Sequence, residues 1–190
     1  MKVYIVRHGQ SESNRDGVWT GWIDAPLTEK GIADAKRASE LISKCVFDKI
    51  YASDLIRARQ TAENAIPGCV YETSSLLREI NVGNIAGKPL GIIGDAERAV
   101  IAKEGYISLG GESKEQFVQR IKSFMGELEE LQKSGCESVC VFSHAGWLRT
   151  FLDIVVGIYL PRNTVLCGNC TVGIFDYSGE KWKMHSWINL

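Results

Sequence analysis

Two segments of the chain place a histidine directly after an apolar run. Residues 3–6 lead into Arg7-His8-Gly9, and residues 139–142 lead through Ser143 into His144-Ala145-Gly146. A neutral imidazole can act as a nucleophile or as an acid and base near pH 7. An arginine beside His8 at the end of a buried strand is costly to desolvate unless an anion joins it. A single strand-end histidine bonded to a carbonyl is an ordinary feature, but two matched cases favour a reactive anion-binding site.

Two further segments carry side chains suited to the same site. Arg57 falls in the first turn of a helix that is expected to begin with Ser53 as its N-cap, and a helix N-terminus favours an anion. Glu79 lies between apolar residues just before a glycine-rich stretch and could serve as a general acid. An ion-paired structural glutamate is an equally good interpretation of Glu79 from sequence alone.

The elements that must position these residues alternate between short apolar runs and longer segments of helical period, which predicts an α/β fold. In such folds, ligands bind outside the carboxyl ends of parallel strands. The last two strands should pair antiparallel through the turn at Ser178-Gly179, so a mixed sheet is expected. Strands are predicted at Lys2–Val6, Phe47–Tyr51, Ser138–Phe142, Thr171–Tyr177 and Lys181–Trp187.

The clearest helix follows Ser113, because Ser113 and Gln116 form a capping-box pattern. Apolar residues then recur at steps of three and four, at Phe117, Ile121, Phe124, Leu128 and Leu131. Three more helices are expected, over 28–43, 53–66 and about 146–156.

The segment from Gly83 to Gly111 has a different composition. Seven of its 29 residues are glycine, and it lacks a sustained period. We expect a flexible excursion, or a small cap over the site at about 81–111, and no second domain.

The composition suits one domain over residues 1–190. The chain has 190 residues, of which 45% are hydrophobic, and a domain of this size buries about 70% of its unfolded surface. The net charge of -1 and the lack of basic runs argue against nucleic acid as a partner. No apolar run is long enough for a membrane span or a secretory leader, so a cytoplasmic location is expected. The oligomeric state stays open.

Taken together, these segments resemble the histidine phosphatase superfamily, the phosphoglycerate-mutase-like proteins, over most of the chain. Arg7-His8-Gly9 is the signature, and other stretches follow in the family order. They are residues 10–14, Thr20-Gly21-Trp22, residues 26–31, residues 53–62 and Ser143-His144-Ala145-Gly146. The resemblance implies a three-layer α/β sandwich, with a mostly parallel mixed sheet and helices on both faces.

The resemblance also implies roles for individual residues. His8 would attack phosphorus and form a phosphohistidine, while Arg7, Arg57 and His144 would stabilise the charge on the phosphoryl oxygens. No metal and no other cofactor is implied, and the partner is a small phosphorylated substrate. The implied substrate-binding residues are Arg7, Gln10, Ser11, Asn14, Thr20, Gly21, Arg57, His144 and Ala145.

Glu79 matches the proton donor of the family, which gives a proton to the leaving alkoxide and later takes one from water. The motif around Glu79 is looser than the others. Glu12 and Asp16 are alternative carboxylates, although their positions fit a helix or loop surface better.

Three functions stay open at this level. The stretches at 20–22 and 26–31 resemble cofactor-dependent phosphoglycerate mutases. A mutase must also hold a bisphosphate, yet residues 83–111 carry three basic residues against three acidic ones and no arginine pair. A phosphomonoesterase is therefore favoured over a mutase, and a non-catalytic phosphate-binding module is the third alternative.

Cysteine chemistry is a weaker alternative. Cys167-Gly168-Asn169-Cys170 has redox spacing, but it runs into a strand, whereas redox pairs need a helix N-terminus after the first cysteine. No cysteine is followed by arginine six positions later, so a cysteine phosphatase is excluded. Four residues are candidate substrate contacts whose place is open, namely Trp19, Trp22, Tyr106 and Ile107.

Overall fold

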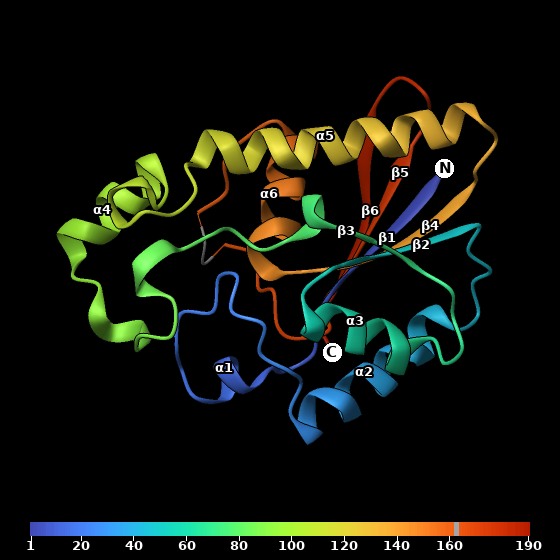
Figure 1. Cartoon of the computed structure of the whole chain (residues 1–190). Coiled ribbons are helices and arrows are strands. Elements are labelled where there is room, and N and C mark those ends of the chain that lie inside the picture. The colour runs from blue at the N-terminus through green and yellow to red at the C-terminus, as the bar shows by residue number, and fades with distance from the viewer. Residues whose placement is uncertain (162–163) are drawn as a thin grey trace.

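A single mixed sheet forms the centre of the molecule (Figure 1). The computed structural model describes residues 1–161 and 164–190. Its strands run in the order β3-β2-β4-β1-β5-β6. The first four are mutually parallel, β5 is antiparallel to β1, and β6 is antiparallel to β5. The mixed sheet is therefore confirmed. The strands are β1 (Lys2–Arg7), β2 (Lys49–Ser53), β3 (Glu72–Ser74), β4 (Ser138–Ser143), β5 (Val172–Tyr177) and β6 (Trp182–Ile188).

Helices cover both faces of the sheet, as the α/β prediction requires. The alternation of side chains along β1 sends Val3 and Ile5 into one apolar cluster, with α5 (Lys114–Lys133) and α6 (Ala145–Val156). It sends Val6 into a second cluster, with α2 (Glu29–Ile42) and α3 (Ile56–Ala65). Figure 1 shows these helix pairs on opposite sides of the strands, so the three-layer sandwich is confirmed.

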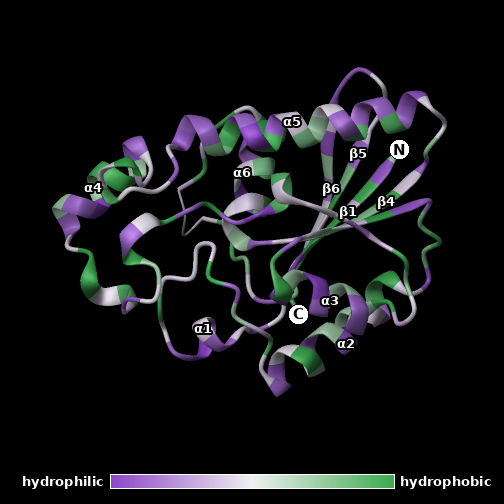
Figure 2. Ribbon diagram, in the orientation of Figure 1, coloured by the Kyte–Doolittle hydropathy of each residue, from purple (hydrophilic) through white to green (hydrophobic). Residues whose placement is uncertain are grey.

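Helix α5 follows its sequence pattern closely. The Ser113 hydroxyl accepts from the Gln116 N–H and the Gln116 side chain accepts from the Ser113 N–H, which completes the capping box. Phe117, Ile121 and Phe124 are buried against the sheet. Hydrophilic and hydrophobic residues accordingly alternate along α5 in Figure 2.

The glycine-rich segment is more ordered than its composition indicated. It contains helix α4 (Asp95–Glu104) and 3-10 turns at Gly83–Ile85, Leu90–Ile92 and Ile107–Leu109. Gly94 and Gly105 are the two caps of α4, and Gly105 has a φ of 80°, which favours glycine. Residues 81–111, called the cap from here on, lie beyond the carboxyl ends of the parallel strands (Figure 1).

The start of α3 differs from the prediction. Ser53 is the last residue of β2, and the N-cap of α3 is Leu55, which has no side-chain cap of its own. Asp24 supplies the missing oxygen, because its Oδ1 accepts from the Ile56 N–H at 2.5 Å. Ser53 is thereby left available for another contact.

Two short elements were not predicted, β3 and helix α1 (Glu12–Arg15). Strand β3 has three residues and no buried apolar side chain, so it carries no periodic signal. Within residues 1–161 and 164–190, no helix is both long enough and apolar enough to cross a membrane.

Candidate active site

The two strand-end histidines meet at one edge of the sheet. Strands β1 and β4 are parallel neighbours, with Arg7 in register with Ser143. The His8 N–H donates to the Ser143 carbonyl at 2.9 Å, and the ring centroids of His8 and His144 lie 5.1 Å apart. The structure thus brings together the two segments that the sequence singled out.

His8 is held as a neutral imidazole. Its Nδ1 lies 2.7 Å from the Gly9 carbonyl, which can only accept, so Nδ1 carries the proton. Burial lowers the pKa of His8 well below its usual value, and the charges of Arg57 and Arg7 lower it further. Its Nε2 makes no hydrogen bond within the described residues, so a lone pair is available on a side chain that is 4% exposed.

His144 is held by hydrogen bonds at both ring nitrogens. Arg57 Nε donates to His144 Nδ1 at 3.2 Å, so the ring proton lies on Nε2 and points to the Ser53 hydroxyl at 2.9 Å. Burial lowers the pKa of His144 well below its usual value, and the Arg57 charge adds to this effect. Ser53, at the end of β2, therefore helps to fix the orientation of His144. The sequence did not indicate this role of Ser53.

Arg57 ties α3 to the segment after His8. Its Nη1 donates to the Ile23 carbonyl and its Nη2 to the Gly21 carbonyl, both at 2.8 Å. Burial lowers the pKa of Arg57 to about 10, so it stays charged at neutral pH.

Arg7 keeps a donor for an incoming anion. Its Nη1 donates to the Cys167 carbonyl at 2.5 Å, while its Nε is buried without a hydrogen-bond partner among the described residues. A buried N–H without a partner costs about 1–3 kcal/mol, and an oxygen of a bound anion would remove that cost.

The Glu79 side chain lies at the N-terminus of α6. Its Oε2 accepts from the Gly146 N–H and its Oε1 from the Ile80 N–H, both at 2.9 Å. A side chain at position 146 would displace the Glu79 carboxylate from this place. Gly146 therefore makes room for Glu79, and Gly9 makes room for the Gly31 carbonyl.

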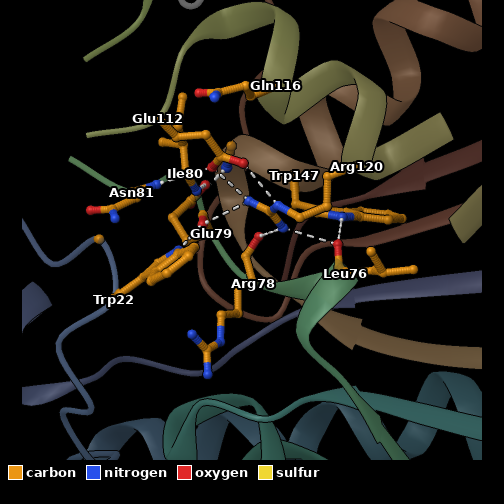
Figure 3. Close-up of polar contacts among 12 residues, drawn as sticks. Trp22, Leu76, Arg78, Glu79, Ile80, Asn81, Glu112, Gln116, Arg120 and Trp147 are labelled. Carbon is orange, nitrogen blue, oxygen red and sulfur yellow. Dashed lines mark hydrogen bonds and ion pairs between the residues drawn. The ribbon is translucent and has the colours of Figure 1, made fainter. Parts of the chain in front are cut away.

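Arg120 of α5 holds the segment that carries Glu79 (Figure 3). Its guanidinium donates to the carbonyls of Leu76, Arg78 and Glu79, at 2.9, 2.7 and 3.1 Å. It is also paired with Glu112 through two bonds, at 2.8 and 2.9 Å, and both side chains are nearly buried. Sequence reasoning missed Arg120, because bonds to backbone carbonyls leave no motif.

A cavity of about 950 Å³ opens above these groups. Among the predicted site residues, those that line it are Arg7, His8, Asn14, Thr20, Gly21, Arg57, Glu79 and Ala145. Three predicted binding residues are not part of its wall, and one of them is His144, which is fully buried. Gln10 Oε1 accepts from the Thr28 hydroxyl, and Ser11 is the N-cap of α1.

Asn14 is oriented by its neighbours. Its Oδ1 accepts from the Ser11 N–H and from Asn169 Nδ2, both at 3.2 Å, so the oxygen is occupied and the NH₂ group is left to donate. Asn169 Nδ2 also donates to the His8 carbonyl at 3.1 Å. Asn169 is a second residue that the sequence did not point to as part of the site.

Of the four candidate substrate contacts, two lie in the wall of the cavity and two lie outside it. Trp19 and Tyr106 line the cavity, whereas Trp22 and Ile107 do not. Trp22 instead donates from Nε1 to the Glu79 carbonyl at 2.7 Å, and its ring lies 4.7 Å from the Arg78 guanidinium. The alternative acids, Glu12 and Asp16, are exposed and outside the cavity.

Cys167 and Cys170 are free and buried, in a loop that enters β5. Burial raises the pKa of both thiols, that of Cys170 to about 12, so the reactive thiolate is disfavoured. Among the residues described, no three His, Cys, Asp or Glu side chains are grouped as a metal site would require.

Comparisons with known proteins agree with this geometry. The model of the histidine phosphatase superfamily (branch 1) matches residues 3–190. A probable phosphoglycerate mutase GpmB of Salmonella paratyphi A is 29% identical over 198 positions, covering 99% of this chain and 90% of the relative.

Solved structures show the same fold. Phosphoglycerate mutase from Thermus thermophilus is 26% identical with a TM-score of 0.78, over 100% of this chain and 99% of that chain. A putative alpha-ribazole-5'-P phosphatase from Escherichia coli K-12 has a TM-score of 0.83 at 23% identity, over 97% and 94% of the two chains. The chain belongs to the histidine phosphatase superfamily, branch 1.

Proposed function

We propose that this protein is a phosphomonoesterase that hydrolyses a small phosphorylated metabolite through a phosphohistidine on His8. The observation that carries the proposal is the neutral, buried His8, whose Nδ1 is bound to a carbonyl and whose Nε2 is free beside Arg7 and Arg57. This imidazole needs no activating base, because its lone pair is already available at neutral pH.

In the first step, His8 Nε2 attacks phosphorus, an N–P bond forms, and the bond from phosphorus to the ester oxygen breaks. Glu79, in its protonated form, gives its proton to the leaving alkoxide. Arg7 and Arg57 stabilise the charge on the phosphoryl oxygens, and the Asn14 NH₂ group adds a neutral donor.

In the second step, water attacks the phosphohistidine and the N–P bond breaks. Glu79, now a carboxylate, takes a proton from that water, so inorganic phosphate leaves and both side chains return to their starting states. The two backbone N–H groups that bind the Glu79 carboxylate keep it at the α6 N-terminus through both steps.

A phosphoglycerate mutase is the second candidate, because four cations line the cavity in addition to Arg7 and Arg57. They are Arg98, Lys114, Lys122 and Arg149. Two of them are engaged elsewhere: Arg98 donates to cap carbonyls, and Lys114 Nζ lies 3.8 Å from the centre of the Tyr159 ring. Arg149 forms no ion pair among the described residues and could bind a second anionic group.

One set of assays separates the candidates. The protein is incubated with p-nitrophenyl phosphate, and with 3-phosphoglycerate in the presence and absence of 2,3-bisphosphoglycerate. A phosphomonoesterase releases phosphate without the bisphosphate, whereas a mutase forms 2-phosphoglycerate only when the bisphosphate is present. The absence of a reaction in every assay would favour the third alternative, a non-catalytic phosphate-binding module.

The matched variants are His8→Ala and His185→Ala. His185 is 52% exposed at the edge of the sheet and paired with Asp176, so its loss should leave turnover unchanged. We expect His8→Ala to abolish phosphate release and the acid-labile phosphoprotein. Wild-type turnover by His8→Ala would disprove the mechanism.

A further inference from the structure

The wall of the cavity beyond His8 is apolar. Six side chains supply it, and each keeps some exposure. They are Trp19, Ile80, Ile101 of α4, Val118 of α5, Ile154 of α6 and Tyr159. The polar groups that can hold phosphate lie at the strand ends, on the other side of the same cavity. The cavity therefore has a phosphate end and an apolar end.

These side chains are not simply the core of the cap. That core is a distinct buried cluster, made of Val82, Ile85, Ile93 and Tyr106. Trp19, Ile80 and Ile101 are partly buried against the cluster, and they also line the cavity. Their remaining surface is therefore available to a ligand.

Of the four cations that line the cavity besides Arg7 and Arg57, two are engaged with other groups of the protein. Arg98 Nε donates to the Ile93 carbonyl at 3.0 Å, and Lys114 lies over the Tyr159 ring. Lys122 is exposed. Arg149, whose charge acts on Arg7, retains a buried Nε without a partner among the described residues, and so does Trp19 at Nε1.

We infer that the substrate is the phosphate ester of a bulky, predominantly apolar alcohol, an inference that rests on the proposed phosphomonoesterase function. Sites of about 300–1,000 Å³ enclose ligands of many heavy atoms, whereas a three-carbon phosphate ester would leave the apolar end filled with water. Covering that wall with hydrocarbon removes apolar surface from water on both sides of the contact.

The test uses n-alkyl phosphates with ethyl, butyl and hexyl chains. Their leaving alcohols have nearly the same basicity, so the chemical step is constant and only the buried hydrocarbon changes. Each added methylene should raise kcat/KM by about fourfold while the chain stays inside the cavity. Propyl phosphate should also be a better substrate than glycerol 3-phosphate, which has the same carbons and two hydroxyls.

The variants Ile101→Gln and Ile107→Gln test the wall directly. Ile101 lines the cavity, whereas Ile107 lies in the same cap, 58% exposed and outside the cavity. Ile101→Gln should lower the hexyl-to-ethyl ratio of kcat/KM severalfold, and Ile107→Gln should leave that ratio unchanged. Because the readout is a ratio, a general loss of folded protein does not affect it.

Equal kcat/KM for ethyl and hexyl phosphate, or a preference for glycerol 3-phosphate over propyl phosphate, would overturn the inference. A binding measurement separates this outcome from failure of the proposed function. Ethylphosphonate and hexylphosphonate are not hydrolysed, and calorimetry gives their Kd. If no ester is hydrolysed but hexylphosphonate binds about tenfold or more tightly than ethylphosphonate, the phosphomonoesterase proposal fails and the apolar subsite stands.

Discussion

The floor of the cavity and its cap are held together by different forces. On the floor, the reactive side chains are oriented by hydrogen bonds to backbone groups, as with His8 to the Gly9 carbonyl and Glu79 to the Gly146 N–H. The cap has a small apolar cluster of its own, around Ile93 and Tyr106, in addition to backbone hydrogen bonds such as that from the Trp19 N–H to the Lys88 carbonyl. Directional bonds fix positions closely, whereas apolar contacts tolerate rearrangement. Changes on the floor should therefore alter the rate for every ester, and changes in the cap should alter the choice among esters.

After the loss of His8 itself, the largest expected effect is that of Glu79→Gln on the floor. It removes the proton donor but keeps the shape, so kcat for an alkyl phosphate should fall about 10²- to 10³-fold. With p-nitrophenyl phosphate the loss should be much smaller, because p-nitrophenolate leaves without a proton. Glu12→Gln, at the exposed alternative acid, is the control. Full turnover of the alkyl ester by Glu79→Gln would remove Glu79 from the mechanism.

Arg120→Met tests how the floor is supported. The Arg120 and Glu112 side chains are 13% and 12% exposed, so loss of the arginine leaves a nearly buried carboxylate without its cation and removes one donor from each of three carbonyls. The free energy of unfolding should fall by about 3 kcal/mol. Lys122→Met, on the exposed side of the same helix, should change it by less than about 0.5 kcal/mol. Urea titration of both variants measures the difference, and equal stabilities would refute the role of Arg120.

The two neutral histidines of the floor make its stability depend on pH. In the unfolded chain each takes up a proton near pH 6.5, while burial and the neighbouring arginines hold the pKa of His8 and His144 far lower in the folded protein. As the pH falls below 6.5, each should lower the free energy of unfolding by up to about 1.4 kcal/mol per pH unit.

Urea titrations at pH 7.5, 6.5 and 5.5 measure this slope. His8→Asn should reduce the slope by about half, since one buried histidine remains. A slope that is the same in His8→Asn and the wild type would contradict the neutral assignment.

A smaller effect on kcat/KM is expected at Asn169, which orients the Asn14 donor on the floor. Asn169→Ala and Asn14→Ala should each lower kcat/KM about tenfold, since each removes or misdirects one hydrogen bond to a charged group. If Asn169 acts through Asn14, the double variant should resemble either single variant. If the two fold-losses in kcat/KM instead multiply in the double variant, the residues act separately.

The smallest effect is expected in the cap. Ile93→Ala weakens the apolar cluster of the cap, and a local unit can open without unfolding the sheet. KM for a large ester should rise by about two- to fivefold, while kcat stays within about twofold. Its neighbour Ile92 is 51% exposed, so Ile92→Ala is a matched control that should change neither constant. A loss in kcat as large as that of a floor variant would show that the cap also positions the reacting groups.

The floor and the cap also differ in how well they could be predicted from the sequence. The strand ends with His8 and His144 were predicted, because a buried strand and the residue after it are adjacent in the chain. The helix in the cap was missed because Gly94 and Gly105 looked like signs of flexibility, although they are the caps of α4. Composition alone does not distinguish a glycine that ends a helix from one in a loose loop.

The supporting residues were missed for another reason. Arg120 and Asn169 act on backbone carbonyls of segments more than 40 and 150 positions away in the chain. Any segment offers such carbonyls, so no residue type at the far end signals the partner. The role of Ser53 was misassigned for the same reason, since its partner His144 lies 91 positions later.

The place of β1 in the sheet has a consequence for how the protein is made. The strand occupies residues 2–7, yet its two neighbours, β4 and β5, end at Ser143 and Tyr177. During synthesis, β1 leaves the ribosome long before either neighbour and must wait for them. The apolar stretch Val3–Val6 stays unpaired until β4 is made, and exposed apolar strands favour aggregation. A nascent chain that ends before β4 therefore cannot bring the ends of β1 and β4 together.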